Sequence, residues 1–175
     1  MEWLLLLAVI AVAFAVLLSW TAGRVDRLHH RIEGARAALE AQLMHRSGAA
    51  LELAATGVLD PARSLLLMDA AHQARASDQV DREMAESDLS QALVASLGDD
   101  AEVARLQEHP AAQELLGELG NACRKVELAR RFHNDVVASA LALRRNVVVR
   151  WFGLAGHADM PVTVEMDDTW PSGLP

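Results

Sequence analysis

The chain begins with an unusually long apolar segment. The eighteen residues from Trp3 to Trp20 contain no charged residue, no proline and no glycine. A helix rises about 1.5 Å per residue, so roughly 20 mainly apolar residues cross a hydrocarbon layer of about 30 Å. Tryptophan is enriched where a membrane meets water, and this segment has one at each end. The sequence therefore predicts a transmembrane anchor over residues 1–23, in contact with the lipid bilayer through residues 3–20.

Two alternatives to an anchor fit this segment less well. A cleaved signal peptide has a positively charged start, a short apolar core and small residues before the cleavage site. Here the start contains Glu2, and cleavage after Ala22 would leave the bulky Trp20 three residues before the cut. A core helix that is apolar on every face would need a far larger protein around it.

The flanking charges predict the orientation of the anchor. Only the α-amino group and Glu2 precede it, whereas four arginines follow it closely: Arg24, Arg27, Arg31 and Arg36. Arginine and lysine are retained on the cytoplasmic side of a membrane. We therefore expect a single-pass protein of the cell membrane, with a short N-terminus outside and the C-terminal domain in the cytoplasm.

The rest of the chain has the composition of one helical domain. Tyrosine is absent and aromatic residues make up 4% of the chain, which is poor for β-strands. Apolar residues recur at alternating steps of three and four in two long stretches, a pattern typical of packed helices. The first stretch contains Val25, Leu28, Ile32, Ala35 and Leu39; the second begins near Pro110 and contains Leu119, Ala122, Val126, Ala129, His133, Val136, Ala140 and Leu143.

Between these stretches, residues 60–98 form a third helical region. Asp60 suits an N-cap, Pro61 suits the first helical position, and Gly98 suits a C-cap. A break at Ser77–Asp78 would divide the region into two helices, and the pattern leaves one or two open. We expect its packing side to contain Leu65, Met68, His72, Val80, Met84, Leu89, Leu93 and Leu97.

The predicted fold class is therefore all-α. A single N-terminal transmembrane helix continues without a break into an antiparallel bundle of three to four long helices. The bundle is expected over residues 24–150 and a C-terminal tail over residues 151–175. Two prolines and a glycine fall within the last seven residues, so we expect the last residues to be disordered.

The net charge of −8 is unevenly distributed. Residues 78–118 carry eleven acidic and two basic residues, whereas residues 119–150 carry seven basic and two acidic ones. The simplest interpretation is that two helix surfaces complement each other within the domain. Contact of the basic segment with anionic lipid headgroups is the alternative. Nucleic acid is not an expected partner, because no aromatic residues interleave the basic ones.

No motif predicts a catalytic, cofactor-binding or metal-binding site. The chain contains no HExxH, CxxC, glycine-rich phosphate loop or nucleophile elbow. His29 and His30 are adjacent, so they point about 100° apart on a helix and cannot share a metal ion. The pair His157 and Asp159 has no partners nearby in sequence. Asp99, Asp100 and Glu102 fit a helix N-cap and first turn.

Two further polar features have structural interpretations. His133 and Asn134 lie within the second apolar stretch, and we expect a buried polar pair that fixes helix register rather than a catalytic pair. Cys123 is the single cysteine, so an internal disulfide is excluded and we expect a small buried hydrophobe.

The segment from Ala129 to Val137 (ARRFHNDVV) resembles the ARR-x-Y-N-x-x-V signature of the LemA family, bacterial proteins with one N-terminal membrane helix and a cytoplasmic helical domain. Residues 24–46 correspond to the helix that follows the family's span. The segment 151–154, with Met160-Pro161 and Glu165, is similar to the family's closing F-G-F…P-x-F-E.

The chain departs from the family at three places: His133 replaces a tyrosine, Leu141 replaces a second asparagine, and a Phe-Pro pair near Val147 is absent. Fifteen arginines against one lysine are typical of a GC-rich bacterial genome. The resemblance implies a divergent LemA-like protein, a fold in which Trp151 and Phe152 close onto the bundle, and no particular reaction.

Two classes of function remain. The first is a membrane-anchored helical scaffold that binds other proteins at the cytoplasmic face, with an envelope signalling or stress accessory as a variant. The second is an enzyme whose site lies in the bundle without a motif. We expect the first class, and therefore no enzymatic activity and no cofactor.

Overall fold

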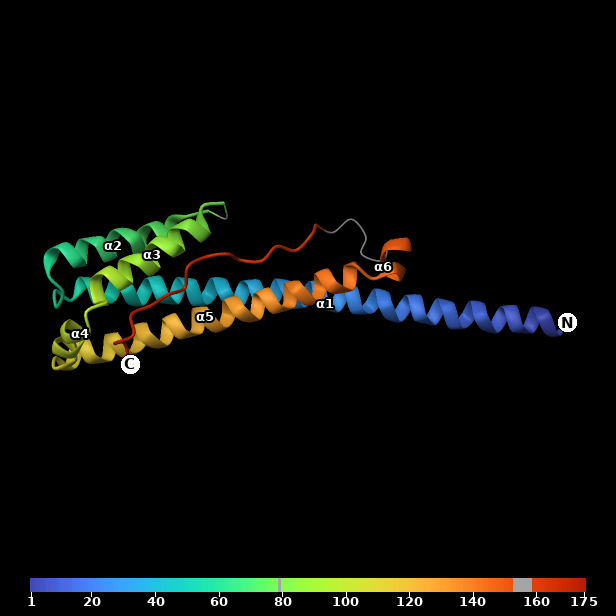
Figure 1. The fold of residues 1–175 in the computed structure, drawn as a ribbon, viewed down its shortest axis with the longest axis horizontal. Helices are drawn as coiled ribbons and strands as arrows, with labels where there is room; N and C mark the ends of the chain where they lie inside the picture. The colour runs from blue at the N-terminus through green and yellow to red at the C-terminus, as the bar shows by residue number, and fades with distance from the viewer. Residues whose placement is uncertain (79, 153–158) are drawn as a thin grey trace. The chain divides into compact units, whose positions relative to one another are not determined.

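A computed structural model describes residues 1–78, 80–152 and 159–175. Within these residues the secondary structure consists of α-helices and contains no β-strand, so the predicted all-α class is confirmed. The helices are α1 (Glu2–Ala55), α2 (Pro61–Ala76), α3 (Arg82–Leu97), α4 (Asp100–Gln107), α5 (Pro110–Arg144) and α6 (Val147–Trp151) (Figure 1).

Helix α1 runs through 54 residues, so the apolar segment continues into the following helix as predicted. An interior glycine costs a helix about 1 kcal/mol relative to alanine, too little for Gly23 or Gly34 to interrupt so many consecutive hydrogen bonds. By length and composition α1 could cross a membrane, and none of its most apolar 18-residue window is buried. A core helix of this chain would be mostly buried, so the exposure of the window differs from that of a core helix.

The chain forms two compact units, each of which combines distant segments. Unit 1 consists of Met1–Arg36 and Phe132–Thr163, and unit 2 consists of Ala37–Arg131 and Val164–Pro175. Helices α1 and α5 each contribute to both units. The boundaries predicted after residues 23 and 150 follow the apolar segment, whereas this division follows which helix segments contact each other.

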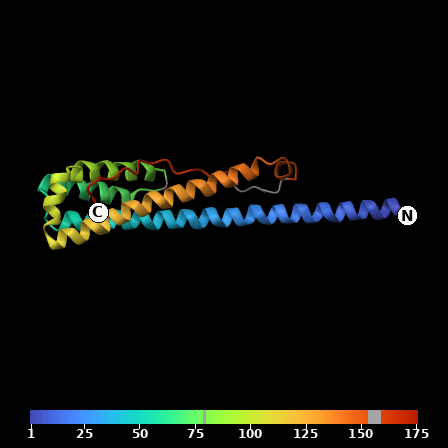
Figure 2. The same ribbon diagram turned by 60° about the horizontal axis from the view of Figure 1, so that its bottom comes forward.

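In unit 2, α2 and α3 lie side by side along the C-terminal part of α1 (Figures 1 and 2). One apolar cluster joins α1 to α5 and the end of the chain, and it includes the fully buried Leu53, Leu67, Leu89, Leu93, Leu97, Leu106, Leu116 and Leu119. Burying one leucine side chain contributes about 1.5–3 kcal/mol, so this cluster is the main source of stability in unit 2.

The break at Ser77–Asp78 is real, and it separates α2 from α3. The Asp60 carboxylate caps α2 by accepting hydrogen bonds from the amides of Ala62 and Arg63, at 3.0 and 3.1 Å. Gly98 is the C-cap of α3, as predicted.

The predicted packing side of α2 is wrong at Leu65 and His72, whereas Met68 packs against the core as predicted. Leu65 is 68% exposed and His72 is exposed, whereas the buried residues of this helix are Leu67, Ala70, Ala71 and Ala74. Three alanines form this face because small side chains let neighbouring helices approach closely, and the pattern of large residues did not reveal them. The pattern also fails at Val80 and Met84, which are 87% and 69% exposed.

The apolar stripe predicted on α5 is confirmed. Leu119, Ala122 and Val126 are completely buried, and the stripe continues through His133, Val136 and Ala140.

The short helix α4 was not predicted, although its N-cap was: the Asp99 carboxylate accepts a hydrogen bond from the Ala101 amide at 3.0 Å.

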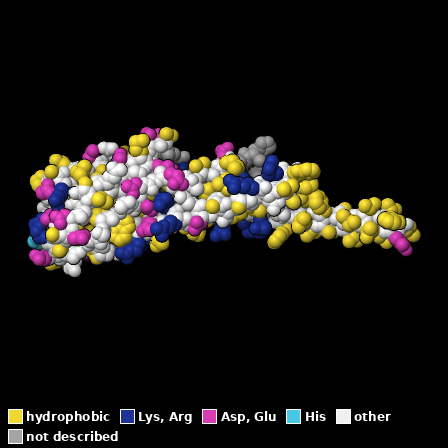
Figure 3. Space-filling model, viewed as in Figure 1, with side chains coloured by type: hydrophobic (Ala, Val, Ile, Leu, Met, Phe, Trp, Pro, Cys, Tyr) yellow, Lys and Arg dark blue, Asp and Glu magenta, His cyan; other side chains and the backbone are white. Residues whose placement is uncertain are grey.

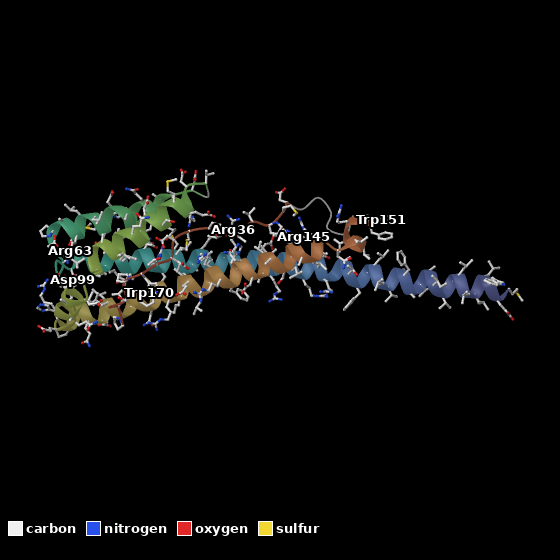
Figure 4. The ribbon with its side chains drawn as sticks, in the orientation of Figure 1. Arg36, Arg63, Asp99, Arg145, Trp151 and Trp170 are labelled. Carbon is white, nitrogen blue, oxygen red and sulfur yellow. The ribbon has the colours of Figure 1, made fainter. Side chains whose placement is uncertain are left out.

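The end of the chain is packed, which differs from the expected disorder. Leu174 is 5% exposed and joins the core of unit 2, and the Trp170 ring lies 5.7 Å from the Arg124 guanidinium (Figure 4). The backbone passes so close to α5 that a Cβ at Gly120 would lie 2.5 Å from the Pro175 carbonyl oxygen. Proline and glycine exclude a helix here, but an extended segment can still bury its apolar side chains.

Candidate functional site

In unit 1, an open groove of about 790 Å³ lies between α1 and the end of α5. Its lining is Trp20, Arg24, Arg27, Leu28 and Arg31 from α1, with Ser139, Ala142, Leu143 and Asn146 from the other side. Steps of three and four place the α1 residues on one helix face. Figure 3 shows Lys and Arg side chains gathered where the apolar rod of α1 ends. The groove thus begins at the last residue of the apolar segment.

The groove has an excess of positive charge. Arg24, Arg27 and Arg31 are exposed, and no Asp or Glu lines the groove. Among the described residues, no ion pair joins any of these three arginines to a carboxylate. The Arg24 guanidinium lies 5.5 Å from the Trp20 ring, within the range of a cation–π contact. Guanidinium donors match the oxygens of phosphate and carboxylate groups, so the groove can bind an anion.

Helix α6 forms an apolar rim beside the same segment. The Asn146 side chain caps this helix by accepting a hydrogen bond from the Val148 amide at 3.0 Å. Trp151 is 82% exposed (Figure 4), so its expected closure onto the bundle is not observed. The Phe152 ring instead meets Phe14 of the apolar segment edge-on, with 5.2 Å between the ring centroids. The rim therefore lies alongside the apolar segment itself.

Unit 2 contains a buried polar network around Arg46, which is 0% exposed. The Arg46 Nη2 donates to the Glu86 Oε2 at 2.7 Å and to the Glu86 carbonyl at 3.0 Å. Its Nη1 donates to the Ser90 Oγ at 2.9 Å. Burial raises the pKa of the Glu86 carboxyl above its usual value, although the charge and hydrogen bond of Arg46 act in the opposite direction.

The network also holds the tail of the chain. The Ser90 Oγ donates to the Asp167 carbonyl at 2.7 Å, and the Asp167 amide donates to the Ser87 Oγ at 3.0 Å.

The sequence predicted no role for Arg46, although a signal was present. Leu39, Leu43, Arg46 and Ala50 follow steps of four, three and four, which place Arg46 on the packed side of α1.

The signature-like segment of α5 also contacts the tail. The Arg130 Nε donates to the Asp168 Oδ2 at 2.8 Å, and both side chains are mostly buried. His133 is buried as expected, but its Nε2 lies 3.4 Å from the Val162 carbonyl, so its partner is the tail rather than another helix. Within the described residues, the His133 Nδ1 has no hydrogen-bond partner.

The remaining candidates from the sequence form no common site. His29 and His30 each contact Glu33, at 3.3 and 3.4 Å, and both are exposed. His157 lies outside the described residues, and Asp159 is exposed. In the part of the chain that is described, no group of three or more His, Cys, Asp or Glu side chains could hold a metal ion.

Cys123 is buried, as predicted for a small hydrophobe, and burial raises the pKa of its thiol to about 11. A protonated, buried thiol is a poor nucleophile. Cys123 therefore belongs to the core rather than to a reactive site.

The acidic segment 78–118 remains largely at the surface, where eight of its eleven acidic residues are exposed. Its contacts with basic side chains of other helices reach back to α1 and α2: Glu86 pairs with Arg46, Glu102 with Arg63 at 3.5 Å, and Glu118 lies 3.5 Å from His45. Arg130 of the basic segment pairs with the tail. These pairs differ from the expected complementarity between the two segments, and they leave most of the acidic charge facing solvent.

No family model, no curated protein and no solved structure matches this chain.

Proposed function

We propose that this protein is a single-pass, membrane-anchored helical scaffold without catalytic activity, which holds a helical interaction domain at the cytoplasmic face of the cell membrane. The observation that carries the proposal is the continuity of α1. One end of this helix is an exposed apolar window of membrane-spanning length, and its other end supplies Ala49, Ala50 and Leu53 to the core of unit 2. The same helix thus serves as anchor and as core element.

In this proposal residues 3–20 contact the bilayer, the short N-terminus lies outside, and the helices that follow form an antiparallel cytoplasmic bundle. The four arginines after the apolar segment support this orientation. We also propose that the chain is a divergent LemA-like protein from a bacterium. The sequence resemblance at residues 129–137 supports this assignment, as does the position of this segment after one long apolar helix.

The proposed partners are proteins with a basic surface. The exposed acidic residues of α3, α4 and the start of α5 supply a negative field that attracts such a surface, and salt weakens attractions of this kind. Leu65 and Leu66 of α2 are 68% and 46% exposed and offer apolar contact area on the same unit.

Topology is tested with reporters fused after Pro175. We expect a fluorescent protein that matures only in the cytoplasm to be active in this fusion, and a phosphatase that folds only outside the cytoplasm to be inactive. The opposite result would reverse the orientation and place the proposed interaction domain outside the cell.

Partner binding is tested by crosslinking in native membranes with the full chain. We expect neutralisation of three exposed acids (Asp88→Asn, Glu108→Gln and Glu114→Gln) to reduce the crosslinked partners, and added salt to reduce them for the unaltered protein. The matched control neutralises three exposed acids elsewhere (Glu52→Gln, Asp135→Asn and Glu165→Gln). Equal capture by both triple variants, independent of salt, would contradict an acidic interaction surface.

A further inference from the structure

We propose that the groove between α1 and the end of α5 binds the headgroup of an anionic phospholipid, with α6 lying in the membrane interface as its apolar rim. This inference rests on the proposed membrane anchoring, and it adds a ligand site to it. The ligand class is a glycerophospholipid with a net negative headgroup, taken from the leaflet in which the anchor ends.

The first argument is charge. Arg24, Arg27 and Arg31 project from one face of α1 into a groove with no acidic residue in its lining. In the described part of the chain, no ion pair joins any of these three guanidinium groups to a carboxylate. Ser139 and Asn146 add neutral polar groups from the opposite wall. Basic pockets between helices on the cytoplasmic side of a membrane are suited to anionic headgroups.

The second argument is depth. Trp20 ends the apolar segment and marks the hydrocarbon boundary in the proposed orientation. At about 1.5 Å per residue, Arg24 lies about 6 Å and Arg27 about 10 Å beyond Trp20 along the helix axis. The polar layer of a bilayer leaflet is roughly 5–8 Å thick. Arg24 thus starts within the polar layer of the leaflet, whereas Arg27 and Arg31 start beyond it, on the water side of the lipid phosphates.

The third argument is the apolar rim. Val147, Trp151 and Phe152 are 66%, 82% and 47% exposed, although all three are large and apolar. The contact of Phe152 with Phe14 places this rim beside the apolar segment, on the membrane side of Trp20. Tryptophan favours the interface between lipid and water. A bilayer would therefore cover the side chains that the protein itself leaves uncovered.

A lipid fits the groove better than a soluble anion does. A smaller hollow of about 350 Å³ shares Trp20 and Arg27 with the groove and is lined further by Val16 and Ser19 of the apolar segment and by Gly23. The positive lining and the apolar surface are thus continuous. A headgroup joined to acyl chains uses both surfaces, whereas free phosphate uses only the arginines.

The test measures lipid binding by the full chain in a mild neutral detergent, where membrane orientation has no effect. Native mass spectrometry compares phosphatidylglycerol with phosphatidylcholine for three proteins. These are the unaltered chain, a groove variant (Arg24→Gln, Arg27→Gln and Arg31→Gln) and a charge-matched control (Arg75→Gln, Arg124→Gln and Arg131→Gln). Far-UV circular dichroism confirms that all three keep the same helix content.

We expect the unaltered chain and the control to prefer phosphatidylglycerol, and the groove variant to lose affinity for it about 10- to 100-fold. We expect Trp151→Ser with Phe152→Ser to weaken lipid binding, and inorganic phosphate to compete only poorly. Equal loss in the groove variant and the control would overturn the site, as would an absence of lipid preference in the unaltered chain. Strong competition by inorganic phosphate would identify a soluble anion instead of a lipid.

A separate measurement distinguishes failure of this site from failure of the anchor. We expect the groove variant and the unaltered chain to remain in membranes after alkaline carbonate extraction. A chain that stays in the membrane without lipid preference would refute the groove alone. A chain that carbonate releases would refute the anchoring on which the groove depends.

Discussion

Replacing Arg46 with methionine should test how the buried network stabilises unit 2. Methionine retains much of the apolar stem of arginine but has no charge and no hydrogen-bond donor. The substitution removes the three hydrogen bonds from Arg46 to Glu86 and Ser90. It leaves the Glu86 side chain, 2% exposed, without its cationic partner.

Removing one partner of a buried ion pair costs about 3–5 kcal/mol, and we expect Arg46→Met to fall in this range near neutral pH. Burial already raises the pKa of Glu86, and Arg46 is the main influence that lowers it. In the variant this pKa should therefore rise further. When folding raises the pKa of a carboxyl, the folded state loses stability as the pH increases from the pKa of the unfolded state to the pKa of the folded state. The loss caused by Arg46→Met should be smaller at pH 4.5 than at pH 8.

Equilibrium urea unfolding of the full chain in mild detergent, followed by far-UV circular dichroism, measures these free energies. The double variant Arg46→Met with Glu86→Leu should recover most of the lost stability, because an apolar pair of similar volume often replaces a buried ion pair without net cost. A loss below about 1 kcal/mol that is equal at both pH values, with no coupling to Glu86, would refute the argument.

Two further substitutions and one labelling reaction probe the core. Leu174→Ala should lower the free energy of unfolding by about 2–3 kcal/mol in the same urea assay, because Leu174 lies in the core of unit 2; an unchanged midpoint would mean that the end of the chain is not packed. Val126→Asp places a carboxylate at a completely buried position and should lower the free energy of unfolding by several kcal/mol, and with it the melting temperature. An unchanged melting temperature would show that residue 126 faces solvent. The Cys123 thiol, with a pKa of about 11, is protonated and buried at pH 8, so a maleimide should label the folded chain slowly and the urea-unfolded chain rapidly; equal rates would contradict its burial.

Local sequence signals predicted the helices better than they predicted the contacts between them. Hydrophobic periodicity and capping chemistry were sufficient to predict the apolar segment, the caps at Asp60 and Gly98 and the stripe on α5. Each of these features depends on residues that are close in sequence. The buried side of α2 was missed because alanine contributes little to an apolar pattern, and helix propensity alone does not reveal which face is covered.

The sites depended on distant residues and were correspondingly harder to predict. Arg46 occupied a packing position in the pattern, but arginine is rarely buried unless it is paired, and Glu86 lies 40 residues away. Arg24, Arg27 and Arg31 were recognised as orientation signals. Their common groove could not be predicted, because its second wall comes from residues 139–146.

The attachment of the tail has a consequence for the order of events during synthesis. Ser90 and Ser87 bind Asp167 across 77 and 80 residues of sequence, so unit 2 remains incomplete until Asp167 has left the ribosome. At about 5–20 residues per second, Asp167 is made about 7–30 s after Trp20. In the proposed anchoring, the apolar segment therefore meets the membrane while the residue that binds Ser87 and Ser90 is still missing. The proposed insertion of the anchor would then precede closure of the core of unit 2 around the tail.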